Sequence, residues 1–367
     1  MHILHVVGAR PNFMKAAPVL RALSTHSGVR QTLVHTGQHY DAAMSEVFFH
    51  QLEMPQPDCN LGVGSGTHAQ QTAAVMIALE PVLLERKPDL VLVYGDVNST
   101  VAAALVCSKL GIRVGHVEAG LRSRDRGMPE EINRLLTDQL SDLLFTPSAD
   151  GDENLLHEGI DGAKIHRVGN VMIDTLVRLL PRAKEKFPSD VPTPYALVTL
   201  HRPSNVDDLP WLAKLLATLA DLSTHLHVIF PVHPRTRERL EAIGSQPSRA
   251  RLRLVEPLPY LEFLALQSRA ALVITDSGGI QEESTFLNVP CLTVRENTER
   301  PITITMGTNQ LVGRDLEKLR AAANKILQRA AARNETKNPG TAGVPLWDGQ
   351  AAERIAQIIV RAPVEVR

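Results

Sequence analysis

The chain has 367 residues, of which 44% are hydrophobic and 22% charged. At about 150 residues per domain, this length predicts two domains. The formal net charge of −1 argues against nucleic acid as a partner, because nucleic-acid binding needs a basic surface. Cys59, Cys107 and Cys291 stand far apart and lack CxxC spacing. This favours a reducing, cytoplasmic compartment and argues against a disulfide framework. No apolar run approaches the ~20 residues of a membrane helix, so we expect no membrane association.

The first half of the chain alternates short apolar strands with helices. Its composition predicts strands over 3–7, 31–35, 90–94, 112–117 and 143–146. Helical periodicity covers 12–24, 69–87, 99–110 and 131–141. Strands that are apolar along almost their whole length are typical of a parallel sheet covered by helices on both faces.

The alternation pauses over 181–194, where Pro, Lys, Glu, Ser and Asp dominate, and then resumes. Further strands are predicted over 196–200, 227–231, 252–255, 271–275 and 291–294. Further helices are predicted over 211–222, 261–267, 281–287, 315–329 and 349–360, with a polar loop over 334–343. We therefore predict an α/β protein of two Rossmann-like domains, 1–180 and 181–367. They would face a cleft that is the default ligand site.

Several acidic residues come directly after predicted strands or open a helix. Asp96 follows the strand 90–94 after one glycine, Glu118 follows 112–117, and Glu130 and Glu131 follow Pro129. Open parallel sheets place their ligands at the carboxyl ends of strands. Each acid alone is also compatible with a helix cap or a solvated surface. Together they predict an acid–base site, because such chemistry needs both a proton donor and a proton acceptor.

Two turns have the character of anion sites. Gly8-Ala9-Arg10-Pro11 links the first strand to the first helix, with Lys15 about one turn further along. Asp276-Ser277-Gly278-Gly279 precedes the helix that contains Glu283. Glycines at a helix N-terminus let a phosphate approach free backbone N–H groups. One such turn in each half suggests a bound diphosphate, although a simple tight turn explains Ser277–Gly279 equally well.

Histidines provide a third group of candidates. His201 and His233 each follow a predicted strand, which favours a ligand or proton-transfer role, and His39 has weaker support. The glycine-rich stretch 62–66 lacks the buried strand that a dinucleotide loop requires. Neither a Walker motif nor HExxH occurs, so nothing in the sequence calls for a cofactor or a metal.

Taken in order, these motifs resemble a known family. They are Gly8-Ala9-Arg10-Pro11, Gly95-Asp96, the run 116–122 (HVEAGLR), the run 129–134 (PEEINR), His201-Arg202, the run 276–283 (DSGGIQEE) and Glu299-Arg300-Pro301. The set resembles the bacterial non-hydrolysing UDP-N-acetylglucosamine 2-epimerases from the first strand to the last helix.

The resemblance implies a GT-B fold, a cytoplasmic homodimer and a UDP-sugar substrate. The reaction would invert C2 by eliminating UDP to a glycal and adding it back, which serves cell-surface polysaccharide synthesis. The last helix could pack back on the N-terminal domain. Asp96, Glu118, Glu130 and His201 match catalytic positions, and Arg10, Lys15 and Arg134 match charged active-site positions. Contacts to uridine, phosphate and ribose fall on His233, Ser277, Gly278, Gly279 and Glu283.

The chain also departs from the family pattern. Pro203-Ser204-Asn205 follows His201-Arg202 where many members have a second Arg and a Glu, so no role is carried over for that Glu. Some members bind a second UDP-N-acetylglucosamine as an activator. Gln38, His39 and Arg202 fit part of that site, whereas the glycine-rich stretch 58–71 does not. Allosteric activation therefore stays open.

Four alternatives remain at this point. The substrate could be a modified UDP-sugar such as a 2,3-diacetamido uronic acid, or the enzyme could hydrolyse its substrate. A retaining GT-B glycosyltransferase would share the nucleotide end but would not explain three carboxylates in the N-terminal domain. A nucleotide-sugar sensor would need no acid–base residues.

Overall fold

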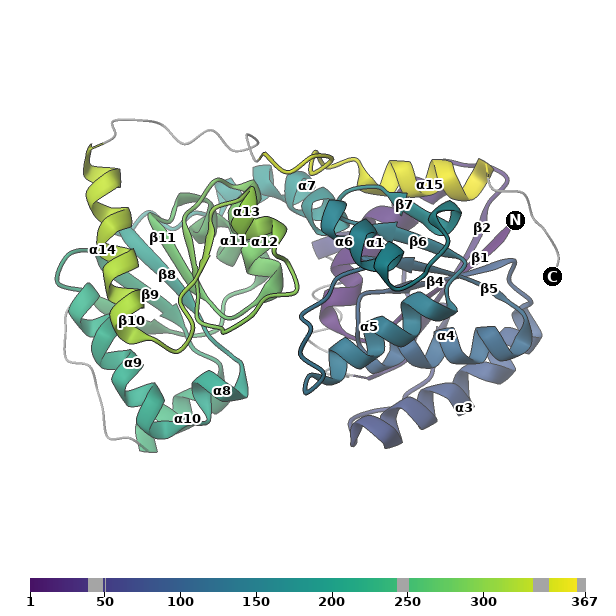
Figure 1. Cartoon of the computed structure of the whole chain (residues 1–367), viewed down its shortest axis with the longest axis horizontal. Helices are drawn as coiled ribbons and strands as arrows, with labels where there is room; N and C mark the ends of the chain where they lie inside the picture. The colour runs from purple at the N-terminus through teal and green to yellow at the C-terminus, as the bar shows by residue number, and fades with distance from the viewer. Residues whose placement is uncertain (39–48, 50, 243–250, 333–342, 362–367) are drawn as a thin grey trace. The chain divides into compact units, whose positions relative to one another are not determined.

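The computed structural model describes residues 1–38, 49, 51–242, 251–332 and 343–361. The chain forms two compact units. One comprises Met1–Thr175 with Pro345–Arg367, and the other comprises Leu176–Val344. Each unit has a parallel β-sheet with helices packed around it (Figure 1).

The N-terminal sheet has the strand order β3-β2-β1-β4-β5-β6-β7, and its neighbouring strands pair in parallel. Its strands are β1 (His2–Val7), β2 (Arg30–His35), β3 (Cys59–Asn60), β4 (Leu90–Tyr94), β5 (Arg113–Val117), β6 (Leu143–Thr146) and β7 (Ile165–Arg167). The strand order reverses between β1 and β4. Such a reversal opens a crevice at the carboxyl ends of the strands.

Helices cover this sheet and explain its apolar strands. They are α1 (Arg10–Ser24), α3 (His68–Arg86), α4 (Asn98–Leu110), α5 (Pro129–Leu140), α6 (Ala149–His157), the start of α7 (Val171–Glu185) and α15 (Ala351–Arg361). A short 3₁₀ turn spans Gly162–Lys164. Strand residues such as Leu4, Val91 and Val114 pack in one cluster with Leu79 of α3 and Ala103 of α4.

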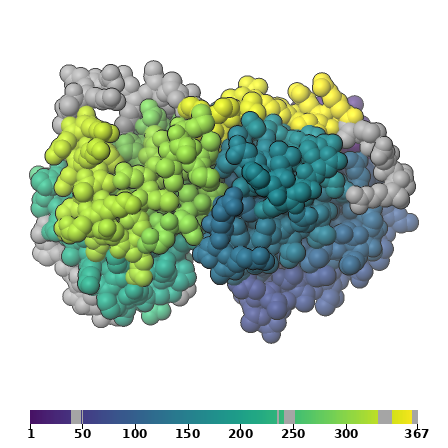
Figure 2. Space-filling view, viewed as in Figure 1, coloured from purple at the N-terminus to yellow at the C-terminus, as the bar shows by residue number. Residues whose placement is uncertain are grey.

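The end of the chain returns to the N-terminal unit. α15 packs against α1, and Figure 2 shows the yellow segment on the surface of this unit. Trp347 Nε1 donates to Pro147 O at 2.9 Å. The Asp174 carboxylate of α7 accepts the backbone N–H groups of Ala351 and Ala352 at 3.1 and 2.7 Å. Asp174 thus caps the first turn of α15 from a distant part of the chain.

The C-terminal sheet has the order β10-β9-β8-β11-β12-β13 and is also parallel. Its strands are β8 (Tyr195–Thr199), β9 (His227–Pro231), β10 (Leu252–Val255), β11 (Leu272–Thr275), β12 (Cys291–Thr293) and β13 (Asn309–Leu311). Its helices are α8 (Pro203–Val206), α9 (Leu209–Leu222), α10 (Pro234–Ala242), α11 (Tyr260–Arg269), α12 (Gly278–Phe286), α13 (Ile302–Thr305) and α14 (Leu316–Ala332). Here the order reverses between β8 and β11.

The predicted α/β class with two Rossmann-like domains is confirmed. The elements that sequence analysis did not place are mostly short: β3, β7 and β13 have two or three residues, and α8 and α13 have four. The predicted pause over 181–194 begins later than expected, because α7 continues through Pro181 to Glu185 and β8 starts at Tyr195. The structure divides the chain after Thr175 rather than after residue 180. Most of the predicted loop 334–343 lies outside the described residues.

Candidate functional site

Two of the predicted acids lie at the carboxyl edge of the N-terminal sheet, each beside a cation. Glu118, directly after β5, pairs with Lys15 of α1. Asp96, two residues after β4, pairs with Arg134 of α5. Gly95 lies beside the first pair, since a Cβ at this position would stand 2.5 Å from Lys15 Nζ and 3.2 Å from Glu118 Oε2. The structure thus gathers four of the predicted site residues around the ends of β4 and β5.

The backbone of Glu118 has an unusual conformation. Its φ is +74°, a value that side-chain-bearing residues rarely adopt and that costs about 1–3 kcal/mol. The N–H groups of Glu118 and Ala119 both donate to Phe145 O on β6, at 3.1 and 3.0 Å. The fold therefore holds this carboxylate at a strained turn, as is common at functional sites.

The two neighbouring acids of α5 have different surroundings. Glu131 is buried, accepts from Ser123 and Arg124, and pairs with Arg134 at 2.7 Å. Burial acts to raise the pKa of Glu131, but these hydrogen bonds and Arg134 hold it below its ordinary value. Glu130 is half-buried and lines a cavity. Glu131 therefore holds the loop before α5 in place, whereas Glu130 borders the cavity.

That cavity, of about 220 Å³, opens beside Asp96 and Glu130. Most of its remaining lining residues have amide, hydroxyl or imidazole side chains. The full set is Gln38, Ser65, Gly66, His68, Gln71, Val97, Asn98, Pro129 and Asn133. Asn98 donates to Gln71 Oε1 at 2.8 Å, and Asn133 donates to Asp96 O at 2.8 Å. Apart from Gln38, sequence analysis did not select these polar residues. Their positions beside Gly95-Asp96 and in the run 129–134 were the available signal.

The turn after β1 differs from the predicted phosphate loop. Asn12 Oδ1 accepts the N–H groups of Gly8 and Ala9 at 3.0 and 3.1 Å, and Asn12 Nδ2 donates to Tyr94 O at 2.7 Å. These two N–H groups are therefore occupied within the protein. Of the predicted cations here, Lys15 is buried and Arg10 is exposed at the start of α1.

The residues proposed for a second sugar-nucleotide site fall in different places. Gln38 lines the N-terminal cavity, and its Oε1 accepts from Ser99 N and Oγ at 3.1 and 2.7 Å. His39 lies outside the described residues. Arg202 belongs to the C-terminal unit, where its Nε donates to Asp276 O at 3.2 Å.

In the C-terminal unit, His201 follows β8 and contacts Asp276, which follows β11. His201 Nδ1 lies 3.0 Å from Asp276 Oδ1, and the carboxylate also accepts from Arg202 N and Asn205 Nδ2 at 3.0 Å each. Burial acts to raise the pKa of Asp276, but His201 and Asn205 hold it below its ordinary value. The His201 side chain is 57% exposed. Because Asp276 engages Nδ1, Nε2 is the nitrogen that can meet a ligand.

Asn205 belongs to the segment Pro203-Ser204-Asn205, which departs from the family pattern, and it has a structural role here. It is fully buried, and its amide donates to both Asp276 and Val294 O. It therefore holds the loop after β8 against the loop after β11. Sequence analysis named Asp276 only as part of a turn and gave Asn205 no role.

The predicted anion turn opens helix α12, with Ser277 as its N-cap residue. The first backbone N–H groups of a helix have no partner within the helix, so Gly278 and Gly279 are suited to an anion. A Cβ at Gly278 would lie 2.7 Å from Glu299 Oε1 and in contact with Arg300. Arg300 pairs with Glu282 at 2.9 Å and Glu299 at 2.5 Å.

The remaining predicted contacts also lie in the C-terminal unit. His233 is exposed after β9. Glu283 is buried in α12 and accepts from Tyr260 Oη at 2.9 Å. Tyr260 had not been selected from the sequence.

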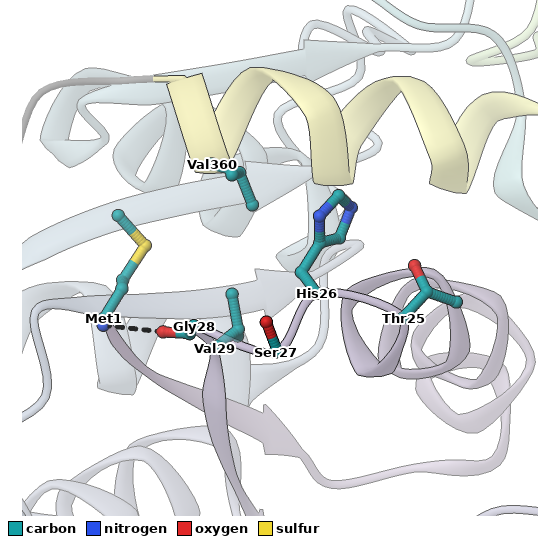
Figure 3. Close-up of a pocket in the computed structure, with 7 residues that line it drawn as sticks. All are labelled: Met1, Thr25, His26, Ser27, Gly28, Val29 and Val360. Atoms are coloured by element: carbon teal, nitrogen blue, oxygen red, sulfur yellow. Dashed lines mark hydrogen bonds between the residues drawn. The ribbon is translucent and has the colours of Figure 1, made fainter.

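Another hollow, of about 500 Å³, is lined by Met1, Thr25–Val29 and Val360 (Figure 3). The Met1 amine donates to Gly28 O there at 3.0 Å. The described residues that line it include no carboxylate, so it does not carry the predicted acid–base chemistry.

The described ranges contain neither a candidate metal site nor a candidate membrane helix. Across those ranges, no group of three or more His, Cys, Asp or Glu side chains is placed to hold a metal ion. Over the same ranges, no helix has the length and apolar character needed to cross a membrane.

Comparisons with a family model and with known proteins all point to 2-epimerases of UDP-sugars. The family model described as UDP-N-acetylglucosamine 2-epimerase matches residues 21–360. The chain is 44% identical over 366 residues to the UDP-N-acetylglucosamine 2-epimerase of Methanococcus maripaludis, covering 96% of this chain and 97% of that one. It is 42% identical over 364 residues to the UDP-2,3-diacetamido-2,3-dideoxy-D-glucuronate 2-epimerase of Pseudomonas aeruginosa, covering 98% and 100%.

A solved structure extends this likeness to the fold. The Methanocaldococcus jannaschii UDP-GlcNAc 2-epimerase, in complex with UDP-GlcNAc and UDP, matches with a TM-score of 0.88 at 42% identity. The match covers 99% of this chain and 100% of that one. The predicted GT-B class is thereby confirmed. The chain belongs to the UDP-N-acetylglucosamine 2-epimerase family of enzymes.

Proposed function

We propose that this protein interconverts UDP-N-acetylglucosamine and UDP-N-acetylmannosamine by elimination and re-addition of UDP. The observation that carries the proposal is the group of carboxylates at the ends of β4 and β5 and the start of α5. Asp96 and Glu118 each lie beside a cation, and Glu130 and Asp96 line one cavity. Family membership supports the same reaction class.

The chemistry explains the need for several carboxylates. The C2 proton is not next to a carbonyl, so simple deprotonation is very unfavourable. In the proposed elimination, a carboxylate takes the C2 proton, the C1–O bond breaks, and its electron pair leaves on the β-phosphate oxygen of UDP. Re-addition of UDP to the resulting glycal, with protonation at the opposite face of C2, gives the epimer. One group acts on each face, and we assign these roles jointly to Asp96, Glu118 and Glu130.

Cations and backbone dipoles would stabilise the charges of this reaction. Lys15 and Arg134 hold Glu118 and Asp96 in place. We assign the diphosphate to His233 and the Ser277–Gly279 turn, because a helix N-terminus favours negative charge. Glu283 suits a ribose contact as a hydroxyl acceptor. His201, oriented by Asp276, would assist the leaving group as a proton donor or hydrogen-bond donor.

The test is incubation with UDP-N-acetylglucosamine in D₂O, followed by NMR of the C2 position. We expect deuterium at C2 and a mixture of gluco and manno nucleotide sugars. Recovery of unlabelled, unchanged substrate would contradict the proposal for this substrate. Free sugar with an equal amount of UDP would indicate hydrolysis instead.

A second candidate substrate follows from the Pseudomonas relative, named for a diacetamido uronic acid. The two substrates differ by a carboxylate and a second acetamido group, so kcat/KM measured for both in the same assay separates them. The described lining of the cavity contains the carboxylates Asp96 and Glu130 and no Lys or Arg, so it offers no cation to a sugar carboxylate. We therefore expect UDP-N-acetylglucosamine to have the higher kcat/KM.

We also propose that the enzyme is a cytoplasmic homodimer. Its three cysteines all carry free thiols, as expected in a reducing compartment. Helix α3 presents an exposed apolar face, with Ile77 74% and Leu84 55% exposed. Large apolar side chains grouped on one helix face favour a partner surface. Cell fractionation tests the location, and light scattering tests the oligomeric state.

A further inference from the structure

A fully buried pair of side chains, His116 and Asp138, contacts the loops that carry Asp96 and Glu118. His116 is on β5, Asp138 is on α5, and both side chains are 0% exposed. His116 Nδ1 lies 2.6 Å from Asp138 Oδ1, and His116 Nε2 lies 2.8 Å from Gly95 O. Neither residue has a role in the proposed reaction. The pair therefore needs its own explanation.

The hydrogen bonds define the charges of this pair. A carbonyl oxygen only accepts, so His116 Nε2 carries a proton and donates it to Gly95 O. Burial acts to raise the pKa of Asp138, but His116 and Arg122 hold it below its ordinary value. Asp138 is thus a carboxylate, and His116 Nδ1 donates to it as well. Since burying an ion pair has a high desolvation cost, such pairs are weak sources of stability and are better explained by specificity.

The pair connects the two loops that carry Asp96 and Glu118. On one side, His116 holds the carbonyl of Gly95, the residue before Asp96, whose φ is +62°. On the other side, Asp138 Oδ2 accepts Gly120 N at 3.1 Å and contacts Arg122 at 2.7 Å. Gly120 also has a positive φ, of +80°. Both loops thus turn at a glycine in the left-handed region, and the pair holds one backbone group at each turn.

Residues of helix α5 help to place all three candidate carboxylates, Asp96, Glu118 and Glu130. Glu130, Arg134 and Asp138 are spaced four residues apart, which places them along one face of the helix. Glu130 lines the cavity, and Arg134 pairs with Asp96. Asp138 contacts the loop after β5 directly and the loop after β4 through His116. Any shift of this face would change the separation of the three acids.

We propose that His116 and Asp138 are positioning residues that set where Asp96 and Glu118 stand relative to Glu130. The inference rests on the proposed function only for its catalytic consequence. A misplacement of about 1 Å can cost about 10²-fold in rate. We therefore expect His116→Gln and Asp138→Asn to lower kcat by about that factor. KM and the Kd for UDP should stay within about threefold, because uniform binding is not affected.

A matched control separates positioning from general destabilisation. His5 on β1 and Tyr94 on β4 form another fully buried pair in the same sheet, with His5 Nδ1 2.7 Å from Tyr94 Oη. This histidine touches neither carboxylate loop in the contacts that the structure shows. His5→Gln should lower the melting temperature less than His116→Gln does, because His5 and Tyr94 form a neutral hydrogen bond, and its kcat at 25 °C should stay near the wild-type value.

A second readout does not depend on any substrate. Hydrogen exchange of the free enzyme should show faster exchange of the amides of Gly95 and of 118–121 in His116→Gln and Asp138→Asn, and not in His5→Gln. If the wild-type enzyme proves inactive on UDP-N-acetylglucosamine, the proposed function fails while this measurement still tests the positioning role.

Kinetics with C2-deuterated substrate complete the experiment. Displaced carboxylates slow proton transfer, so the isotope effect on kcat should rise in both variants. Asp138→Asn should retain more activity than Asp138→Ala, because its amide oxygen can still accept from Gly120. Unchanged exchange at both loops, or a kcat loss that only follows the unfolded fraction, would overturn the proposal.

Discussion

Glu130 and Glu131 are neighbours in sequence with different surroundings, which makes them a sharp test at the scale of single residues. Glu130→Gln removes a half-buried carboxylate from the cavity beside Asp96. We expect kcat to fall by about 10²–10⁴-fold, the usual contribution of a general acid or base, with little change in melting temperature. Steady-state kinetics and thermal denaturation check both.

Glu131→Gln should behave differently. It removes a buried carboxylate that accepts from Ser123 and Arg124 and pairs with Arg134. Breaking a buried, hydrogen-bonded ion pair costs about 3–5 kcal/mol, so the unfolding free energy should fall clearly. Equal kinetic losses with equal stability in both variants would refute the assignment of Glu130.

Individual residues also show the limits of sequence reasoning. Asp96, Glu118 and Lys15 could be selected because acids and cations near strand ends are visible in the chain. Their pairing across more than 100 residues, as in Lys15–Glu118, is fixed only by the strand order. The supporting residues Asn12 and Asp276 could not be recognised, since their role is to hold backbone groups of other segments.

At the scale of elements, the start of α12 offers a test of the proposed diphosphate site. Gly278→Ala would place a Cβ 2.7 Å from Glu299 Oε1 and against Arg300. The turn must move to relieve this contact, which misaligns the N–H groups at the helix start. We expect the Kd for UDP to rise by about tenfold or more, as for one lost charge-assisted hydrogen bond. Isothermal titration calorimetry measures it.

The control for this variant is Gly162→Ala, where the added Cβ would have an ordinary contact at 3.7 Å. It lies in the N-terminal unit and should leave UDP binding unchanged. If Gly278→Ala binds UDP as well as this control does, the turn does not contact the nucleotide.

The cap of α15 makes stability depend on pH. Burial raises the pKa of Asp174 from 3.8 to about 6. The pKa of Asp174 is higher in the folded protein than in the unfolded one. Its contribution to the free energy of unfolding is therefore fully present below about pH 4 and is lost as the pH rises through about 6. A pKa that rises from 3.8 to about 6 on folding corresponds to roughly 3 kcal/mol. Asp174→Asn should flatten the pH dependence of the unfolding free energy between about pH 4 and 6. Urea titrations across this range that give the wild-type slope in the variant would contradict the assignment.

Most of the long strands and helices were predicted and the shortest were missed, although the 15-residue helix α7 was missed as well. Strands such as β4 (Leu90–Tyr94) are uniformly apolar because helices cover both faces of the sheet, and this composition is easily recognised. β3 has only two residues, too few for any periodicity. Pro181 was taken as a break, but α7 contains it in its interior. Tertiary packing there outweighs the local cost of proline.

At the scale of the whole molecule, the return of residues from Pro345 onward to the first unit was suggested only by the family resemblance, because composition and periodicity do not predict it. α15 has the amphipathic pattern of any helix that packs on a core, and that pattern does not specify which core. The partner surface depends on contacts such as Trp347 with Pro147, which join positions 200 residues apart. Such long-range contacts leave no local periodic signal.

The proposed homodimer is also tested at this scale, through the exposed face of α3. Ala73, Ile77, Pro81 and Leu84 are all exposed and repeat at helical spacing, so they form a mainly apolar stripe on the outer side of this helix, with the exposed Glu80 on the same face. Burying such a stripe against a second copy would stabilise a dimer, since stable interfaces remove about 1,200–2,000 Å² from water. The wild-type protein should therefore have a mass near twice the 40.2 kDa of one chain in light scattering.

Ile77→Glu places a charge in the middle of this stripe and should shift the protein to a monomer, because an unpaired charge in an apolar interface costs several kcal/mol. Leu156 is 55% exposed on α6, so Leu156→Glu introduces the same charge at a similarly exposed leucine away from α3. That control should stay dimeric. A wild-type protein that is monomeric at micromolar concentration, or an Ile77→Glu variant that remains a dimer, would show that α3 does not form the interface.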